Sequence, residues 1–122
     1  MKVYTDIEQS KKLAEILPLD SADMCYGIDD DTLKYIKIPW LIPYHKYTAK
    51  EFYIPCWSLA ALLDIIPSNL GSSKLTIEKD DLEPLKYRLN YHDTWEIEDD
   101  IQTKYYDDLV DACYEMIINL YN

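Results

Sequence analysis

The C-terminal stretch 107–122 constrains the fold more than any other part of the sequence. Its apolar side chains recur at helical spacing and form one stripe, which consists of Leu109, Ala112, Cys113, Met116, Ile117 and Leu120. The polar side chains fall on the opposite side, at Asp108, Asp111, Glu115 and Asn119. This pattern predicts an amphipathic helix. Because such a helix is not stable alone, the rest of the chain must supply an apolar surface for it.

A first helix is predicted near the N-terminus. Thr5 followed by Glu8 has the spacing of a capping box, in which the two side chains satisfy backbone N–H groups at the start of a helix. Pro18 cannot continue a helix, so this helix is expected to end near Leu17.

A second helix is predicted over about residues 56–66, within the sequence PCWSLAALLDIIP. Its apolar stripe consists of Leu59, Leu62, Leu63 and Ile66. Ser58 and Asp64 are its polar residues, so most of the helix is expected to be buried.

Strands are expected in two parts of the chain. Residues 24–26 and 33–38 are short apolar runs on either side of turn-forming residues, and they predict a β-hairpin. A further short strand is expected at 51–54. Residues 74–100 alternate between apolar and polar side chains and predict a three-stranded β-meander, with its clearest strand at 85–92.

The two sides of the second meander hairpin differ in chemistry. With the loop at 92–94, the expected apolar pairs are Tyr91 with Trp95 and Leu89 with Ile97. The expected charged pairs are Arg88 with Glu98 and Lys86 with Asp100, or Arg88 with Glu96 after a shift of two residues. A shift of one residue would mix the two sides and is disfavoured. The apolar side is the expected surface for the C-terminal helix.

These elements together predict an α+β domain in the order α-β-β-α-β-β-β-α. About three helices pack on one face of a small, mostly antiparallel sheet, which consists of a β-hairpin and a three-stranded meander. With 122 residues, the chain is expected to form a single domain over 1–122.

The composition favours a folded cytoplasmic protein. Hydrophobic residues make up 48% of the chain and there are only two glycines, which argues against disorder. No apolar run approaches membrane-spanning length, and the N-terminus lacks the apolar core of a signal peptide. Cys25, Cys56 and Cys113 are odd in number and widely spaced, which predicts reduced thiols and no zinc cluster. We therefore expect neither a metal nor another cofactor.

The net charge of −11 is unevenly distributed along the chain. Residues 32–63 contain Lys34, Lys37, Lys46 and Lys50 against the single acid Glu51, whereas both flanking parts are strongly acidic. The overall negative charge opposes non-specific binding to nucleic acids and to anionic membranes. We therefore expect neither as a direct partner.

No catalytic constellation stands out in the sequence. His45 and His92 lie in expected turns, where a solvated histidine is the simplest interpretation. Cys56 lies at the predicted start of the second helix, where the helix dipole would lower a thiol pKa, although a buried packing role is commoner. The acidic clusters at 29–31, 80–83 and 99–100 lack the spacing of a calcium loop. An enzyme or ligand binder that uses Cys56 or His92 therefore remains a secondary hypothesis.

The basic part of the chain also collects aromatic residues and prolines, and we call residues 34–57 the aromatic-basic stretch. Aromatic side chains beside cations are common in protein interfaces. The candidate interaction residues are Lys37, Trp40, Tyr44, Lys46, Tyr47, Lys50 and Tyr53. An alternative is that the acidic remainder imitates a nucleic acid and inhibits a basic host protein. That alternative requires the carboxylates of the first helix and of 80–100 to share one continuous face.

A resemblance to a group of known proteins rests on three stretches of the sequence. They are TDIEQSKKLAEILPLDSADMCY at 5–26, PCWSLAALLDIIP at 55–67 and DACYEMIINL at 111–120. Together they resemble a group of small acidic uncharacterised proteins of Bacteroides-type gut bacteria and their phages or prophages. The resemblance implies a bacterial or phage cytoplasmic setting and brings no activity, ligand or catalytic residue. In such relatives the last helix often opens after Asn-Pro; here Asp108 takes that place and is expected to cap the helix.

These observations predict a non-catalytic accessory protein of phage or mobile-element origin. It is expected to bind another protein, or a second copy of itself, through the aromatic-basic stretch.

Overall fold

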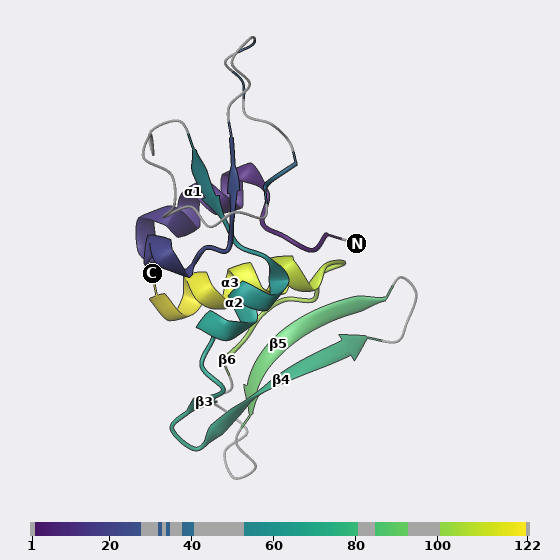
Figure 1. Ribbon diagram of the computed structural model, residues 1–122. Helices are drawn as coiled ribbons and strands as arrows, with labels where there is room; N and C mark the ends of the chain where they lie inside the picture. Colours follow the sequence, from purple (N-terminus) through teal and green to yellow (C-terminus); the bar gives the residue numbers. More distant parts are fainter. Residues whose placement is uncertain are drawn as a thin grey trace.

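The computed structural model describes residues 2–27, 32, 34, 38–40, 53–80, 85–92 and 101–121. In chain order the elements are α1 (Ile7–Ile16), a short 3-10 helix (Leu19–Ser21), β1 (Met24–Tyr26), β2 (Ile54–Cys56), α2 (Leu59–Ile65), β3 (Asn69–Leu70), β4 (Ser73–Asp80), β5 (Lys86–His92), β6 (Ile101–Gln102) and α3 (Leu109–Tyr121). The strands form two antiparallel sheets, β1–β2 and β3–β4–β5–β6, with α2 and α3 between them (Figure 1). The predicted α+β class and order of elements are confirmed, with the two-residue β3 added.

Helix α1 begins one residue later than the sequence pattern predicted. Its N-cap is Asp6, whose carboxylate accepts from the Gln9 N–H at 2.8 Å, while the Gln9 side-chain oxygen accepts from the Asp6 N–H at 3.1 Å. The predicted capping box of Thr5 and Glu8 is therefore wrong. Thr5 is fully buried and its N–H donates to the carbonyl of Trp57 at 3.0 Å, so it belongs to the core instead. The predicted end of the helix near Leu17 is confirmed.

The small sheet is built from segments that lie far apart in the sequence. β1 pairs with β2, whereas the hairpin predicted between 24–26 and 33–38 falls mostly outside the described residues. On the other side of β1, Cys25 exchanges two backbone hydrogen bonds with Trp40, at 3.0 and 2.7 Å. Cys25 lies opposite Pro55, and its N–H and C=O point away from β2. In such an antiparallel pair the backbone nitrogen of Pro55 also points away from β1, so no hydrogen bond between β1 and β2 needs the N–H that proline lacks. This geometry explains how a proline fits in the strand.

Helix α2 begins at Leu59, three residues later than predicted, because residues 54–56 form β2. The predicted strand at 51–54 therefore overlaps β2 only at Ile54, since 51 and 52 lie outside the described residues. Ser58 is the N-cap of α2, and its hydroxyl accepts from the Ala61 N–H at 3.2 Å. Within α2 only Leu62 is buried, so the prediction of a mostly buried helix is wrong.

The register of β5 corrects the predicted hairpin. Arg88 lies opposite Glu78 of β4, and Lys86 lies opposite Asp80. Tyr91 lies opposite Ile101 of β6 and not opposite Trp95, which falls with residues 93–100 outside the described part of the chain. The charged pairs that were expected between β5 and the strand after it therefore lie between β5 and β4, the strand before it. β5 is a central strand, so its side chains had two possible neighbours and the alternation alone could not choose between them.

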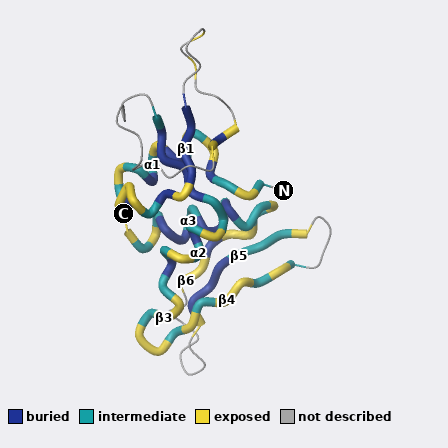
Figure 2. Tube along the Cα trace, viewed as in Figure 1, coloured by how far each residue is buried: buried dark blue, intermediate teal, exposed yellow. Residues whose placement is uncertain are grey.

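The stripe of α3 packs into the main core. Its buried side chains are Val110, Ala112, Cys113, Met116 and Ile117, while Leu109 and Leu120 are half-buried at its margin. They form one core cluster with Leu89 and Tyr91 of β5 and with the buried side chains of α1 and α2. In Figure 2 the trace is dark blue, the colour of buried residues, along parts of these central segments. The expectation that this helix needs an apolar sheet face is therefore met.

The opposite side of α3 is tied to the rest of the protein more than predicted. The Asp111 carboxylate accepts from the Lys2 ammonium at 2.6 Å and from the Gln9 side-chain amide at 2.7 Å. The Glu115 carboxylate accepts from the Lys104 N–H at 2.9 Å, and only Asn119 of the predicted outer face is exposed. The Asp108 carboxylate accepts from the Lys2 N–H at 2.7 Å. The predicted solvent face is therefore largely a set of contacts to the N-terminal segment and to Lys104.

Candidate functional site

The described part of the aromatic-basic stretch contains a pair of aromatic rings. Trp40 and Tyr53 lie with their ring centroids 6.1 Å apart and their planes tilted by 55°. They approach from opposite sides of β1, because Trp40 pairs with Cys25 on one side while Tyr53 directly precedes β2 on the other. This tilted arrangement is one that aromatic pairs favour.

Gly27, the residue that follows β1, makes room for this pair. A Cβ atom at Gly27 would lie 2.6 Å from Cη2 and 2.9 Å from Cζ3 of the Trp40 indole, closer than any real contact allows. The indole therefore rests directly on the glycine backbone. Sequence reasoning missed Gly27, although one of only two glycines in the chain, placed right after a predicted strand, was an available signal.

The seated indole is still accessible to solvent. Trp40 is 37% exposed, and Ile38, two residues earlier, is 69% exposed. An aromatic and an aliphatic side chain thus lie on the surface beside the β1–β2 sheet. Such side chains contribute strongly to protein interfaces, because they bury much area while losing little conformational freedom.

The structure brings together only some of the predicted interaction residues. Trp40 and Tyr53 are in contact as described above. The other five, Lys37, Tyr44, Lys46, Tyr47 and Lys50, lie outside the described residues. Their role in the stretch therefore remains a prediction from the sequence.

Cys56 lies in a buried polar cluster and not at the start of a helix. It is the last residue of β2, and its thiol contacts the hydroxyl of Thr5 at 3.6 Å and donates to the Thr5 carbonyl at 3.4 Å. Tyr26 donates from its hydroxyl to the same carbonyl at 2.7 Å. Burial raises the pKa of the Cys56 thiol to about 11, despite hydrogen bonds from Thr5, Ser10 and Tyr26 that favour the thiolate. The buried packing role that the sequence favoured for Cys56 is therefore confirmed, and the alternative, a thiol pKa lowered by a helix dipole, is wrong.

The two residues of the alternative enzyme hypothesis are not neighbours. Cys56 belongs to the small sheet, whereas His92 is exposed at the end of β5 in the other sheet. His45 lies outside the described residues. Within the described ranges there is also no group of three or more His, Cys, Asp or Glu side chains suited to hold a metal ion.

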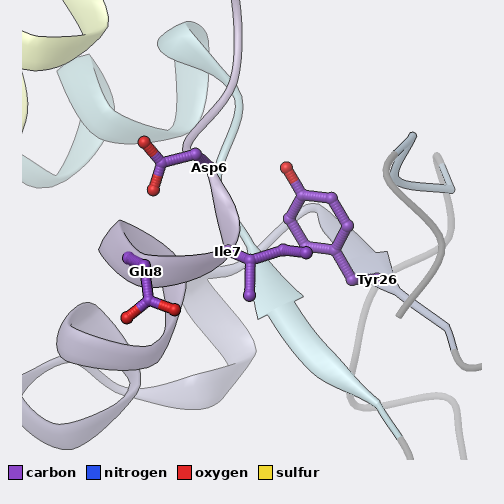
Figure 3. A pocket seen from close by; sticks show the side chains of 4 residues that line it. All are labelled: Asp6, Ile7, Glu8 and Tyr26. Atoms are coloured by element: carbon purple, nitrogen blue, oxygen red, sulfur yellow. The ribbon is translucent and has the colours of Figure 1, made fainter. Parts of the chain in front are cut away.

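A shallow hollow lies beside the start of α1 (Figure 3). It is lined by Asp6, Ile7, Glu8 and Tyr26. Ile7 points toward the Tyr26 ring, whereas the carboxylates of Asp6 and Glu8 point away from it. Asp6 is also occupied by its capping bond and by an ion pair with Lys2 at 3.3 Å. The polar groups do not converge on the hollow, so it lacks the features of a specific ligand site.

Nucleic-acid mimicry requires the carboxylates of α1 and of the 80–100 region to share one face, and Asp80, the last residue of β4, is the one acid of that region that the structure describes. Helix α1 and strand β4 lie on opposite sides of α2 and α3 (Figure 1). The remaining carboxylates of the 80–100 region lie outside the described residues.

Comparisons with known proteins add no relative to this description. No family model, no curated protein and no solved structure matches the chain. Among the described residues, no helix has both the length and the apolar character that a membrane span requires.

Proposed function

We propose that the protein is a non-catalytic binding protein that attaches to another protein, or to a second copy of itself, through the aromatic-basic stretch. The observation that carries this proposal is the Trp40–Tyr53 pair, in which the Trp40 indole rests on Gly27 and is still 37% exposed. A ring held in place before binding loses little freedom on binding, so its burial adds directly to affinity. We infer further that the protein serves as an accessory of a phage or mobile element, in keeping with the sequence resemblance.

The charge of the stretch indicates the kind of surface that it would meet. Four lysines stand against one acid between residues 32 and 63 of an otherwise acidic chain. An acidic partner surface would be complementary to this segment and would be repelled by the rest of the molecule. Electrostatic complementarity of this kind orients a partner more than it strengthens binding.

The test compares two charge-reversed variants with the same change in net charge. Lys37→Glu/Lys46→Glu/Lys50→Glu alters the stretch, whereas Lys11→Glu/Lys12→Glu/Lys104→Glu alters three lysines outside it. Each is used as bait in affinity capture from the native host, and its mass is measured by sedimentation. We expect the first variant alone to lose the captured partner or the oligomer.

A third variant tests the apolar part of the surface. Ile38→Asp changes a side chain that is 69% exposed, so it is not expected to affect folding. It should weaken capture in the same way as the lysine variant. If all variants capture the same partners and sediment like the original protein, the proposed binding surface is wrong.

A further inference from the structure

The outer edge of β4 offers a second, independent surface. β3 pairs with only the first two residues of β4, through Asn69 with Lys74 and Leu70 with Ser73. The next N–H, that of Leu75, donates to the carbonyl of Ser68 at 2.9 Å. From residue 76 to residue 80, no strand of the described chain adjoins this edge. Against the described residues, positions 76–80 of β4 therefore form an edge of the sheet.

The pairing of β4 with β5 shows which backbone groups point outward. Leu75 points its N–H away from β5, so in the alternating pattern of a strand Ile77 and Lys79 do the same. Leu89, which lies opposite Ile77, accordingly directs its carbonyl to the far side, where it accepts from the Thr103 N–H at 2.9 Å. The N–H and C=O groups of Ile77 and Lys79 are thus directed toward an added strand.

The side chains along this edge differ on the two faces of the sheet. Ile77 lies on the face that carries Leu89, yet it is 46% exposed because it lies beyond the cover of the helices. Glu78 and Asp80 lie on the other face, and the cations that accompany them, Arg88 and Lys86, lie on the β5 side. The edge therefore presents the apolar Ile77 on one face and Glu78 on the other, where the Glu78 carboxylate also accepts from the Arg88 and Asn90 side chains of β5.

We propose that this edge binds an extended segment of another protein, which adds as an antiparallel strand to β4. The segment would place an apolar side chain beside Ile77 and a basic side chain beside Glu78. Backbone hydrogen bonds to Ile77 and Lys79 would supply affinity, and the two side-chain contacts would supply selectivity. This surface is separate from the aromatic-basic stretch, so the two proposals stand or fall independently.

A second copy of the chain fits this edge less well. An antiparallel two-fold pairing that uses the whole edge from 76 to 80 would place the two Glu78 side chains directly opposite each other, and like charges so placed are destabilising. A pairing centred on Ile77 avoids this repulsion but needs the Leu75 N–H, which already donates to Ser68. The strand that binds this edge is therefore expected to come from another protein and to carry a basic residue opposite Glu78.

The test uses the peptide acetyl-Thr-Val-Lys-Val-Thr-amide as the probe. Amide exchange and chemical shifts of the nitrogen-15-labelled full chain are followed by NMR during its addition. In the free protein we expect the amides of Ile77 and Lys79 to exchange faster than those of Thr76 and Glu78, which point toward β5. With the peptide, Ile77 and Lys79 should become protected and shift in a saturable way.

Two control peptides separate backbone pairing from other binding. N-methylation of both valines removes the N–H groups that face the edge and should abolish the effect, whereas N-methylation of the lysine should leave it. Replacing the lysine by glutamate should weaken binding about tenfold, which corresponds to about 1.4 kcal/mol, because a like charge would then lie beside Glu78.

Three results would each overturn the proposal. The first is protection of the Ile77 and Lys79 amides in the free protein at all concentrations, which would show that the edge is already covered. The second is protection that rises with protein concentration alone, which would make a second copy the occupant. The third is a peptide effect that survives N-methylation of both valines or ignores the charge of the central residue.

Discussion

Replacing Thr5 by valine tests whether the buried polar cluster holds the N-terminal segment to β2. The change keeps the size and shape of the side chain but removes its hydroxyl. That hydroxyl accepts from the backbone N–H of Trp57 at 3.2 Å and lies 2.7 Å from the hydroxyl of Ser10. Thr5, Ser10 and Trp57 are all fully buried, so water cannot replace the lost oxygen.

The cost follows from the groups that lose their partner. A buried donor left without an acceptor costs about 1–3 kcal/mol, and here the Trp57 N–H is such a donor. The Ser10 hydroxyl also loses its partner, although it can turn toward a carbonyl of its own helix, so its share is smaller. We therefore expect Thr5→Val to lower the free energy of unfolding by about 2–4 kcal/mol, a large part of the roughly 5–15 kcal/mol of a typical domain.

Urea unfolding followed by circular dichroism measures this change. The free energies of the two proteins can be compared if both depend on urea concentration with the same slope, the m-value. Thr76→Val is the matched control, because the Thr76 hydroxyl donates to the Asn90 carbonyl at 3.1 Å on an exposed strand; its effect should stay within about 0.5 kcal/mol. Combining Thr5→Val with Ser10→Ala should cost less than the sum of the two single changes. A Thr5→Val protein as stable as the original would refute the role of this cluster.

Three further predictions follow from single contacts. Gly27→Ala should displace the indole of Trp40 and destabilise the protein by about 1–3 kcal/mol, measured by unfolding and by a shift in tryptophan fluorescence; unchanged fluorescence would contradict the seating of the ring. Cys56, with its pKa raised to about 11, should react with a disulfide reagent at pH 8 only as fast as the protein unfolds, and faster labelling would count against its burial. Burial alone would raise the pKa of Glu78, but hydrogen bonds from Arg88 and Asn90 hold it below its ordinary value of 4.5. Its contribution to stability should therefore be present above pH 4.5 and be lost as the pH falls through the lowered pKa, and Glu78→Gln should flatten this acid-side loss in unfolding curves measured between pH 2 and 6.

Periodic patterns in the sequence were enough to predict the elements themselves. The stripe of α3, the stop of α1 before Pro18 and the alternation in β5 each depend on residues close together in the chain. Their α+β arrangement also followed, because an amphipathic helix and a one-sided strand must cover each other. The patterns failed at the element ends, as the shift of the capping box from Thr5 to Asp6 shows.

Strand pairing depended on contacts that no local pattern records. β1 could pair with any apolar run of suitable length, and the structure selects β2, more than twenty-five residues away. Arg88 could reach a carboxylate on either neighbouring strand, and it lies opposite Glu78. The same holds for the candidate site, since the sequence pointed to Trp40 and Tyr53 but not to Gly27 beneath them.

The sequence by itself determined the class of the fold, the helices and strands, the acidic charge and the position of the aromatic-basic stretch. Only the tertiary structure decided that the pKa of Cys56 is raised, that Trp40 rests on Gly27 and that no described strand pairs with β4 along the edge from residue 76 to residue 80. The physical reason is the range of the interactions. Helical and strand periodicity arise between residues a few positions apart. The burial of Cys56, the contact of Trp40 with Gly27 and the pairing of each strand edge depend on which distant segments meet.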